Sequence, residues 1–234
     1  MLKRNALSVS VVIFLLGAIV AAQNPQKVKD ESERAENAAE VLNEIMKTPD
    51  QSIPQSLLAR SYAMAIIPHV VKGALGVGGR HGKGLIATRQ ASGQWGAPSF
   101  VDISGGSVGL QIGVSATDLI LVFTDKAGLK GLLSGKLKFG VDAAAAAGPV
   151  GRTAEASTDV KLKSAIYSYS RSKGLFAGVS LDGAALSIDD SANHKVYGIG
   201  VSGTDILINN KVKPNPVVKP FVDSLTKNAA KRTK

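Results

Sequence analysis

The sequence contains no cysteine among its 234 residues. This absence excludes disulfides, thiolate metal ligands, cysteine nucleophiles and a lipidated N-terminal cysteine. Aromatic residues make up only 5% of the chain, which leaves little for the base stacking that many nucleic-acid-binding proteins use. We therefore expect no nucleic-acid partner and a fold stabilised by packing alone.

Histidine is also scarce. The three residues, His69, His81 and His194, have no second histidine or carboxylate at the spacing typical of metal ligands. The stretch 105–109 (GGSVG) fits G-x-S-x-G, but it lies between runs that read as strands and no helical pattern follows it, so the sequence indicates no serine nucleophile of that kind. We expect no bound metal, no cofactor and no catalytic residues, and hence a protein that is not an enzyme.

The stretch 73–84 is rich in glycine, as phosphate-binding loops are. Its spacing does not match a Walker A motif, because Val77 stands where the first glycine belongs and Gly84 follows Lys83 where serine or threonine is needed. His81 takes the position of the third glycine in the dinucleotide-binding pattern. Neither nucleotide-binding class is therefore predicted.

The first 22 residues have the pattern of a secretory signal peptide. Lys3 and Arg4 precede an uncharged run from 7 to 22, which ends in small residues. A bilayer-spanning helix needs roughly 20 apolar residues, more than this run contains. We expect residues 1–22 to be cleaved, with an uncleaved N-terminal anchor as the alternative. The protein is then exported, periplasmic or secreted, and peripheral to a membrane.

The full sequence is 44% apolar, and the part that follows residue 22 predicts one α+β domain over 23–210. Apolar residues at helical spacing predict an amphipathic helix over 30–47 with an acidic outer face, and Ser52 and Gln55 have the spacing of a capping box for a second helix over 52–62. Residues 211–234 form a basic, proline-containing tail that is expected to be helical from 218 to 229.

Between the helices, short apolar runs separated by glycine predict the strands of a curved, mostly antiparallel sheet. These runs are 65–68, 85–88, 100–103, 108–114, 119–124, 137–141, 166–169, 175–181 and 184–188. The N-terminal helices are expected to pack on this sheet.

Positive charge is segregated along the chain, which has a net charge of +10. No acidic residue lies between Asp50 and Asp102 or between Asp125 and Asp142, and a third acid-free window lies between Asp159 and Asp182. A basic protein suits an anionic partner. Eight cations are candidates for one lipid-binding face: Lys72, Arg80, Lys83, Arg89, Lys126, Lys130, Lys136 and Lys138.

Apolar side chains beside these cations are candidates for insertion into a membrane. The first group is Leu129, Leu132 and Leu133, next to Lys126 and Lys130, and the second is the C-terminal helix with Phe221 and Leu225. Packing in the core and a solvated tail are the respective alternatives.

Several segments, in this order, resemble the SYLF domain family, also called the lipid-binding SYLF or actin-binding patch family. They lie at 63–73 (AMAIIPHVVKG), 76–86 (GVGGRHGKGLI), 93–113, 118–123 (DLILVF), 146–152, 167–183 and 193–198 (NHKVYG). The resemblance covers roughly residues 32–210.

The resemblance implies binding of phospholipids, with phosphoinositide-like headgroups in eukaryotic members and actin association in fungal ones. Those members are associated with a basic amphipathic N-terminal helix, whereas here a signal peptide precedes an acidic-faced helix. No lipid-contact residue is therefore carried over. We expect non-enzymatic binding of anionic phospholipid at a membrane surface. The alternative is a structural module of the cell envelope that binds a protein or polymer through the same basic face.

Overall fold

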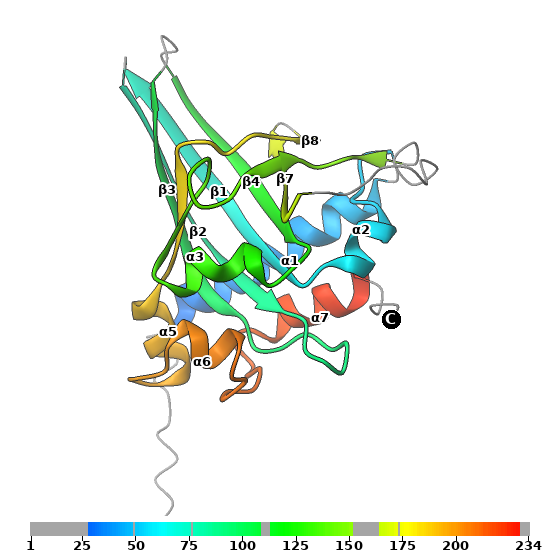
Figure 1. Ribbon diagram of the computed structural model, residues 1–234, viewed down its shortest axis with the longest axis vertical. Coiled ribbons are helices and arrows are strands. Elements are labelled where there is room, and N and C mark those ends of the chain that lie inside the picture. The colour runs from blue at the N-terminus through cyan, green and yellow to red at the C-terminus, as the bar shows by residue number, and fades with distance from the viewer. Residues whose placement is uncertain are drawn as a thin grey trace, which may run out of the picture.

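The computed structural model describes residues 28–48, 50–75, 77–108, 113–151, 164–172 and 174–229. The predicted signal peptide lies outside these residues. Helices cover a strongly curved sheet (Figure 1), so the predicted α+β class is confirmed. Among the described residues, no helix is both long enough and apolar enough to cross a bilayer.

The sheet has nine strands in the order β5-β9-β3-β2-β1-β4-β7-β6, with β8 paired to β7. All neighbouring pairs are antiparallel except β6 and β7, as the sequence predicts for a mostly antiparallel sheet. The strands are β1 (Ala63–Leu75), β2 (Val77–Thr88), β3 (Ser99–Val108), β4 (Gly113–Phe123), β5 (Lys136–Lys138), β6 (Ala145–Ala147), β7 (Ile166–Ser172), β8 (Leu175–Gly178) and β9 (Ala184–Ile188).

The helices are α1 (Lys29–Lys47), α2 (Gln55–Arg60), the 3₁₀ turn η2 (Ala127–Leu129), α3 (Lys130–Leu133), α5 (Asp190–Tyr197), α6 (Gly203–Leu207) and α7 (Lys219–Asn228). The prediction of a capping box at Ser52 is wrong, because Pro54 occupies the N-cap of α2 and no side chain caps the helix. Its φ of −56° and ψ of 135° place it just outside the helix, which begins at Gln55.

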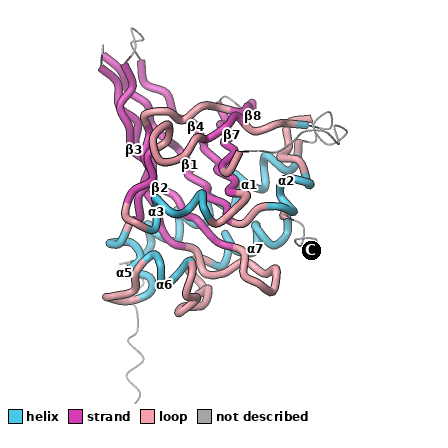
Figure 2. Tube along the Cα trace, in the orientation of Figure 1, coloured by secondary structure: helices cyan, strands magenta, loops and turns pink. Residues whose placement is uncertain are grey.

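Two apolar cores lie on the two faces of the sheet. On the first, α1 and α7 pack on residues such as Met64, Ile120 and Tyr169. On the second, the α3 segment and α6 pack on residues such as Ile67 and Leu121. We call these the helix face and the inner face. Figure 2 shows α3 lying across the sheet from α1 and α7.

The strands β1 and β2 extend further than their apolar runs predict, through the glycine-rich stretch 73–84. Glycine keeps both backbone hydrogen-bonding groups, so it can remain in a ladder where no side chain packs. Gly84 is required for close approach, because a Cβ there would overlap the backbone of Ile66 and Ile67 on β1. The predicted strand 108–114 spans the end of β3 and the start of β4, and 109–112 lie outside the described residues.

The C-terminal helix shares the helix-face core. Phe221 and Leu225 are fully buried, and the Ser224 hydroxyl donates to the Ala39 carbonyl of α1 at 3.1 Å. The helix α7 is therefore packed on the domain, and neither apolar side chain is available for insertion in this conformation.

Candidate anion-binding site

The candidate site lies where β1 and β2 leave the body of the sheet. Lys72 on β1 is the register partner of Arg80 on β2, and directly opposed residues on neighbouring strands point to the same face. Both side chains are half-buried in one narrow hollow of about 10 Å³, room for roughly one water molecule. An anionic group would therefore rest at the mouth of this hollow. Its other lining residues are Val70, Thr117, Leu119, Ser170, Val179 and Leu181.

A β-bulge turns Lys72 toward Arg80. The register of β1 shifts between Ile67 and Val70, two residues that both belong to the inner-face core although they lie three positions apart. Side chains three apart in a regular strand point to opposite faces, so the extra residue changes the alternation. His69, in the bulge, has a φ of 51°. Without the bulge, Lys72 would point to the helix face.

The bulge is held by an ion-pair cluster on the helix face. The Asp118 carboxylate accepts a hydrogen bond from the His69 backbone N–H at 2.9 Å. Arg171 on β7 donates to the same carboxylate, with Nε–Oδ2 at 2.6 Å, and also pairs with Glu44 of α1. A buried, paired carboxylate therefore fixes the backbone that sets the direction of Lys72.

The two cations of the site have no ion-pair partner in the part of the chain that the structure describes. None of the ion pairs between described residues involves Lys72 or Arg80. Burial, and then the nearby Arg80, lower the pKa of Lys72, and burial lowers the pKa of Arg80. The Arg80 Nε is buried without a hydrogen-bond partner. Holding two like charges together in this way disfavours the charged forms, and a bound anion would offset that cost.

Lys83 lies on the opposite side of the sheet. It is three residues from Arg80 on a regular strand, so the two side chains point to different faces. Lys83 lines a hollow against α1 together with Asp30, Glu33 and Arg34. The structure does not bring Lys83 together with Lys72 and Arg80.

Arg89 is buried in the domain, and its assignment to a lipid-binding face is corrected by this position. It is only 5% exposed, and its guanidinium lies 4.5 Å from the centre of the Trp95 ring. It donates to the backbone carbonyls of Leu58 and Gly93, each at 3.3 Å. The sequence does not distinguish this arginine from an exposed one. Its partners are backbone carbonyls and an aromatic ring, so no acidic residue near it in the chain indicates that it is buried.

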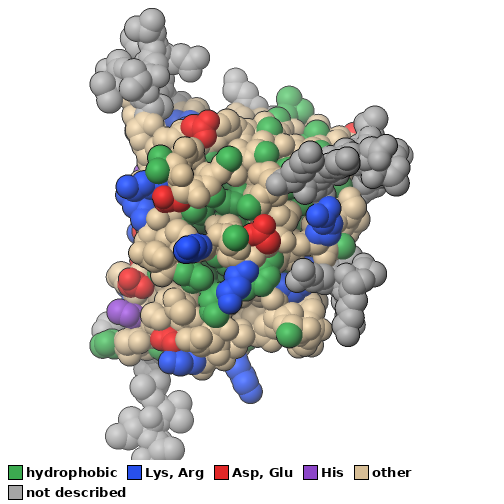
Figure 3. All heavy atoms as spheres, in the orientation of Figure 1, with side chains coloured by type: hydrophobic (Ala, Val, Ile, Leu, Met, Phe, Trp, Pro, Cys, Tyr) green, Lys and Arg blue, Asp and Glu red, His purple; other side chains and the backbone are tan. Residues whose placement is uncertain are grey.

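The remaining four candidate cations are exposed around α3 and β5. Lys126 and Lys130 border an open hollow with Ala127, Leu133 and Ser134. Lys136 and Lys138 lie on the edge strand β5, on either side of the buried Leu137. Figure 3 views the face on which α3 lies and shows basic side chains interspersed with acidic ones. Because Leu137 packs in the inner-face core, Lys136 and Lys138 point to the other face of β5, and none of the four lysines lines the hollow of Lys72 and Arg80.

The proposed insertion leucines are mostly internal. Leu129 and Leu132 are fully buried in the inner-face core, which corrects the expectation that they reach a membrane. Only Leu133 is partly exposed, at the hollow beside Lys126 and Lys130. The core-packing alternative therefore describes Leu129 and Leu132.

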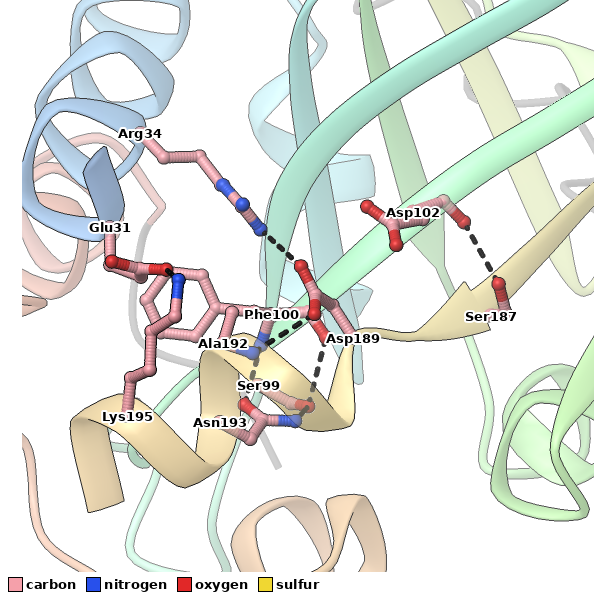
Figure 4. Close-up of polar contacts among 10 residues, drawn as sticks. All are labelled: Glu31, Arg34, Ser99, Phe100, Asp102, Ser187, Asp189, Ala192, Asn193 and Lys195. Atoms are coloured by element: carbon pink, nitrogen blue, oxygen red, sulfur yellow. Dashed lines mark hydrogen bonds and ion pairs between the residues drawn. The ribbon is translucent and has the colours of Figure 1, made fainter. Parts of the chain in front are cut away.

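A polar network that the sequence did not reveal joins α1 to α5 (Figure 4). Arg34 pairs with Asp189 at 2.9 Å, and Lys195 pairs with Glu31 at 2.8 Å. Asp189 also caps α5 by accepting from the Ala192 N–H. Burial alone would raise the pKa of Asp189, but the Ala192 N–H and Arg34 outweigh it and lower that pKa. Each residue has an ordinary partner here, so the network is structural.

Asp102 lies beside this network without an equivalent partner. Burial and then Asp189 raise its pKa, while Lys83 and Arg34 lower it less. Its Oδ1 is buried with no hydrogen-bond partner. No group of three or more histidine, cysteine or acidic residues suited to a metal ion occurs within the described residues.

The candidate site is thus a cationic pair on a glycine-rich sheet, and the fold around it is an α+β domain. Residues 104–228 match a family model described as Ysc84, the Las17-binding protein actin regulator. This chain therefore belongs to the Ysc84 family, and the family resemblance of the sequence motifs is confirmed.

Three similar proteins come from yeast and human. LAS seventeen-binding protein 3 of Saccharomyces cerevisiae is 33% identical over 213 residues, which cover 88% of this chain and 45% of that protein. Protein YSC84 of the same yeast is 34% identical over 213 residues, 88% of this chain and 44% of that protein. Human SH3 domain-containing YSC84-like protein 1 is 33% identical over 193 residues, 81% of this chain and 56% of that protein. The chain spans about half the length of these relatives.

Proposed function

We propose that this chain binds anionic phospholipid at a membrane surface and catalyses no reaction. The observation that carries the proposal is the half-buried pair Lys72 and Arg80 in one hollow, with no ion-pair partner among the described residues. Arginine presents several N–H donors in a planar fork that suits phosphate oxygens, and lysine adds a point charge. A headgroup phosphate at the mouth of the hollow would satisfy both.

The magnitude indicates peripheral, reversible binding. A basic side chain near an anionic leaflet contributes roughly 1 kcal/mol, so two contribute about 2 kcal/mol. The exposed Lys126, Lys130, Lys136 and Lys138 add attraction at longer range, which salt screens. Charge alone therefore gives weak binding, and a further contact with the bilayer is needed.

Flotation of the purified chain with phosphatidylcholine vesicles, with and without phosphatidylglycerol, tests the proposal. We expect recovery with the anionic vesicles only, falling as salt rises. The double variant Lys72→Gln/Arg80→Gln should reduce this recovery, while the matched variant Lys83→Gln, on the other face of the sheet, should leave it nearly unchanged. Equal recovery with both vesicle types, or equal loss in both variants, would contradict the proposal.

A protein partner is the second candidate function. The family description names Las17 binding and actin regulation, and the yeast relatives carry Las17-binding names. The same cationic side chains could contact an acidic protein surface. A pull-down that retains one partner after detergent removes lipid, and loses it in the Lys72→Gln/Arg80→Gln variant, would support this candidate over lipid binding.

We also propose that residues 1–22 direct export to the periplasm or the exterior. The support is the basic start, the short uncharged run and the small residues at its end. Mass spectrometry of the protein recovered from its producing cell should find Gln23 at the N-terminus. A mature protein that begins at Met1 would contradict cleavage.

A further inference from the structure

Beyond the pair Lys72 and Arg80, the described residues continue in four strands, β1 to β4. The pairing of β3 with β9 ends at Gly105, and the pairing of β4 with β7 begins at Asp118. Past these points the described parts of β1 to β4 pair only with one another. Figure 1 shows this end of the sheet standing clear of the helices, and we call it the free end.

The free end has an unusual composition. Its strand segments are 73–75, 77–79, 106–108 and 113–116, and they contain only glycine, alanine, serine, leucine and valine. The charged residues nearest to them on β1 and β2 are Lys72 and Arg80, at the base. An end of this kind has no carboxylate that an anionic surface would repel.

The dimensions match the interfacial layer of a bilayer. Leu75 lies three residues beyond Lys72, and Val77 three residues before Arg80, so at about 3.3 Å per residue the free end reaches about 10 Å past the cations. Peripheral segments bury themselves about 5–10 Å into the boundary between headgroups and acyl chains. Cations at the base would then lie at the level of the phosphates.

We infer that the free end of β1 to β4 enters the interfacial layer of an anionic bilayer while Lys72 and Arg80 hold phosphates at its base. This inference rests on the proposed function and supplies the additional contact that charge alone lacks. The outer edges of β3 and β4 carry backbone groups without a neighbouring strand among the described residues. Such groups need water or headgroups as partners, so the free end stops at the interface and does not cross the acyl core.

The absence of cysteine allows a direct test, because one introduced cysteine carries the only label. Gly79 and Gly106 are exposed, and a Cβ at either would meet only a backbone oxygen, at 3.9 Å and 4.0 Å. Gly79→Cys and Gly106→Cys are therefore expected to fold. Matched controls are Glu40→Cys on the outer face of α1 and Ala127→Cys beside α3, both exposed.

Each variant is labelled with an environment-sensitive fluorophore and mixed with phosphatidylcholine–phosphatidylglycerol vesicles. We expect a blue shift and quenching by a shallow lipid-attached quencher at 79 and 106, with neither change at 40 and 127. Stronger quenching by a deep quencher, unchanged emission at 79 and 106 in vesicle-bound protein, or a shift at 127 alone would overturn the inference and leave the proposed function standing. Failure of every labelled variant and of the unlabelled chain to bind the vesicles would overturn the proposed function itself.

A second measurement needs no label. Gly106→Asp should bind anionic vesicles about fivefold more weakly than Gly106→Ser, the factor that one unit charge is worth beside an anionic leaflet. Ala127→Asp and Ala127→Ser should bind the anionic vesicles with nearly equal affinity. Equal affinities for Gly106→Asp and Gly106→Ser, with folded protein shown by circular dichroism, would contradict entry of the free end.

Discussion

Arg89 and Arg80 lie only nine positions apart, yet their surroundings give them different roles. The Arg89 guanidinium lies against an indole ring and donates to two backbone carbonyls, whereas the Arg80 side chain forms no hydrogen bond or ion pair with another described residue. A buried cation held by such partners stabilises the fold, and a half-buried cation without them indicates a candidate binding site. The distinction depends on neighbours that are distant in the sequence.

Replacing Arg89 should destabilise the domain. Arg89→Ala removes hydrogen bonds from a charged donor and a cation–π contact, and we expect the free energy of unfolding to fall by about 3 kcal/mol. Arg60→Ala, at an exposed position of α2, serves as the control and should change it by less than about 0.5 kcal/mol. Urea denaturation measures both. Equal stability of the two variants would show that Arg89 is not held as described.

Replacing Lys72 should have the opposite effect on stability. Burial and Arg80 lower the pKa of Lys72 in the folded chain, so the charged form costs stability at every pH below that folded-state pKa. The cost decreases as the pH rises from the folded-state pKa toward the ordinary lysine value, because the folded chain then releases the proton first. Since the side chain is partly exposed, Lys72→Met should raise the free energy of unfolding at pH 7 by only on the order of 0.5 kcal/mol.

Denaturation at pH 7 and in alkaline solution checks this sign. The stability advantage of Lys72→Met over the parent chain should shrink as Lys72 loses its proton. The variant should bind anionic vesicles more weakly at pH 7, and this difference should shrink over the same pH range. A variant that is less stable than the parent chain at pH 7 would contradict an uncompensated charge at this position.

Among the elements, the segment of η2 and α3 is a lid on the inner-face core. Its leucines point inward and its lysines outward, which is the ordinary arrangement of a short amphipathic segment. The positive surface beside α3 is therefore a consequence of packing.

Shortening a buried leucine of this segment should affect stability and not membrane binding. Leu132→Ala should lower the free energy of unfolding by about 2–5 kcal/mol, the range for a fully buried leucine. Leu133→Ala, at the partly exposed neighbour, should cost clearly less. Flotation under conditions where Leu132→Ala remains folded should match the parent chain. A selective loss of vesicle binding in Leu132→Ala would restore an insertion role for Leu132.

The helix α7 completes the helix-face core from the far end of the chain. Truncation after Asn210 should uncover the buried side chains of α1 that α7 covers, and the truncated chain should lose cooperative unfolding. Near-ultraviolet circular dichroism and thermal melts measure this loss. Phe221→Ala, expected to cost about 3–5 kcal/mol, is the milder companion variant. A truncated chain with an unchanged melting curve would establish a domain edge near 210.

At the scale of the whole molecule, one sheet carries both cores. Alternate residues of the same strands enter the helix-face and inner-face cores, so neither core can lose its packing without disturbing the strands that support the other. The free end projects beyond the part of the sheet that carries the cores. Its glycines at 79 and 106 are exposed and belong to neither core.

This shared sheet predicts a single unfolding transition for the domain. Calorimetry should give a van't Hoff enthalpy close to the measured enthalpy, as for a two-state system. Two resolved transitions would indicate that the cores unfold separately.

The sequence by itself determined the class of elements and the family. Helical spacing located α1 and α7, short apolar runs separated by glycine located most strands, and ordered motifs indicated the family that the comparisons confirm. These features depend on residues near one another in the chain. The sequence likewise identified Lys72 and Arg80 among its candidate cations, since neither has an acidic neighbour in the chain.

Only the tertiary structure decided which cations meet. The bulge at His69, held by Asp118 from β4, turns Lys72 toward Arg80, while regular alternation sends Lys83 to the other face. In the folded chain, Arg89 is buried against Trp95, and Leu129 and Leu132 are buried in the inner-face core. The spacing of charges along a chain does not show the register of the strands or the face of the sheet to which each side chain points. These two properties set the distance between charges in the folded protein.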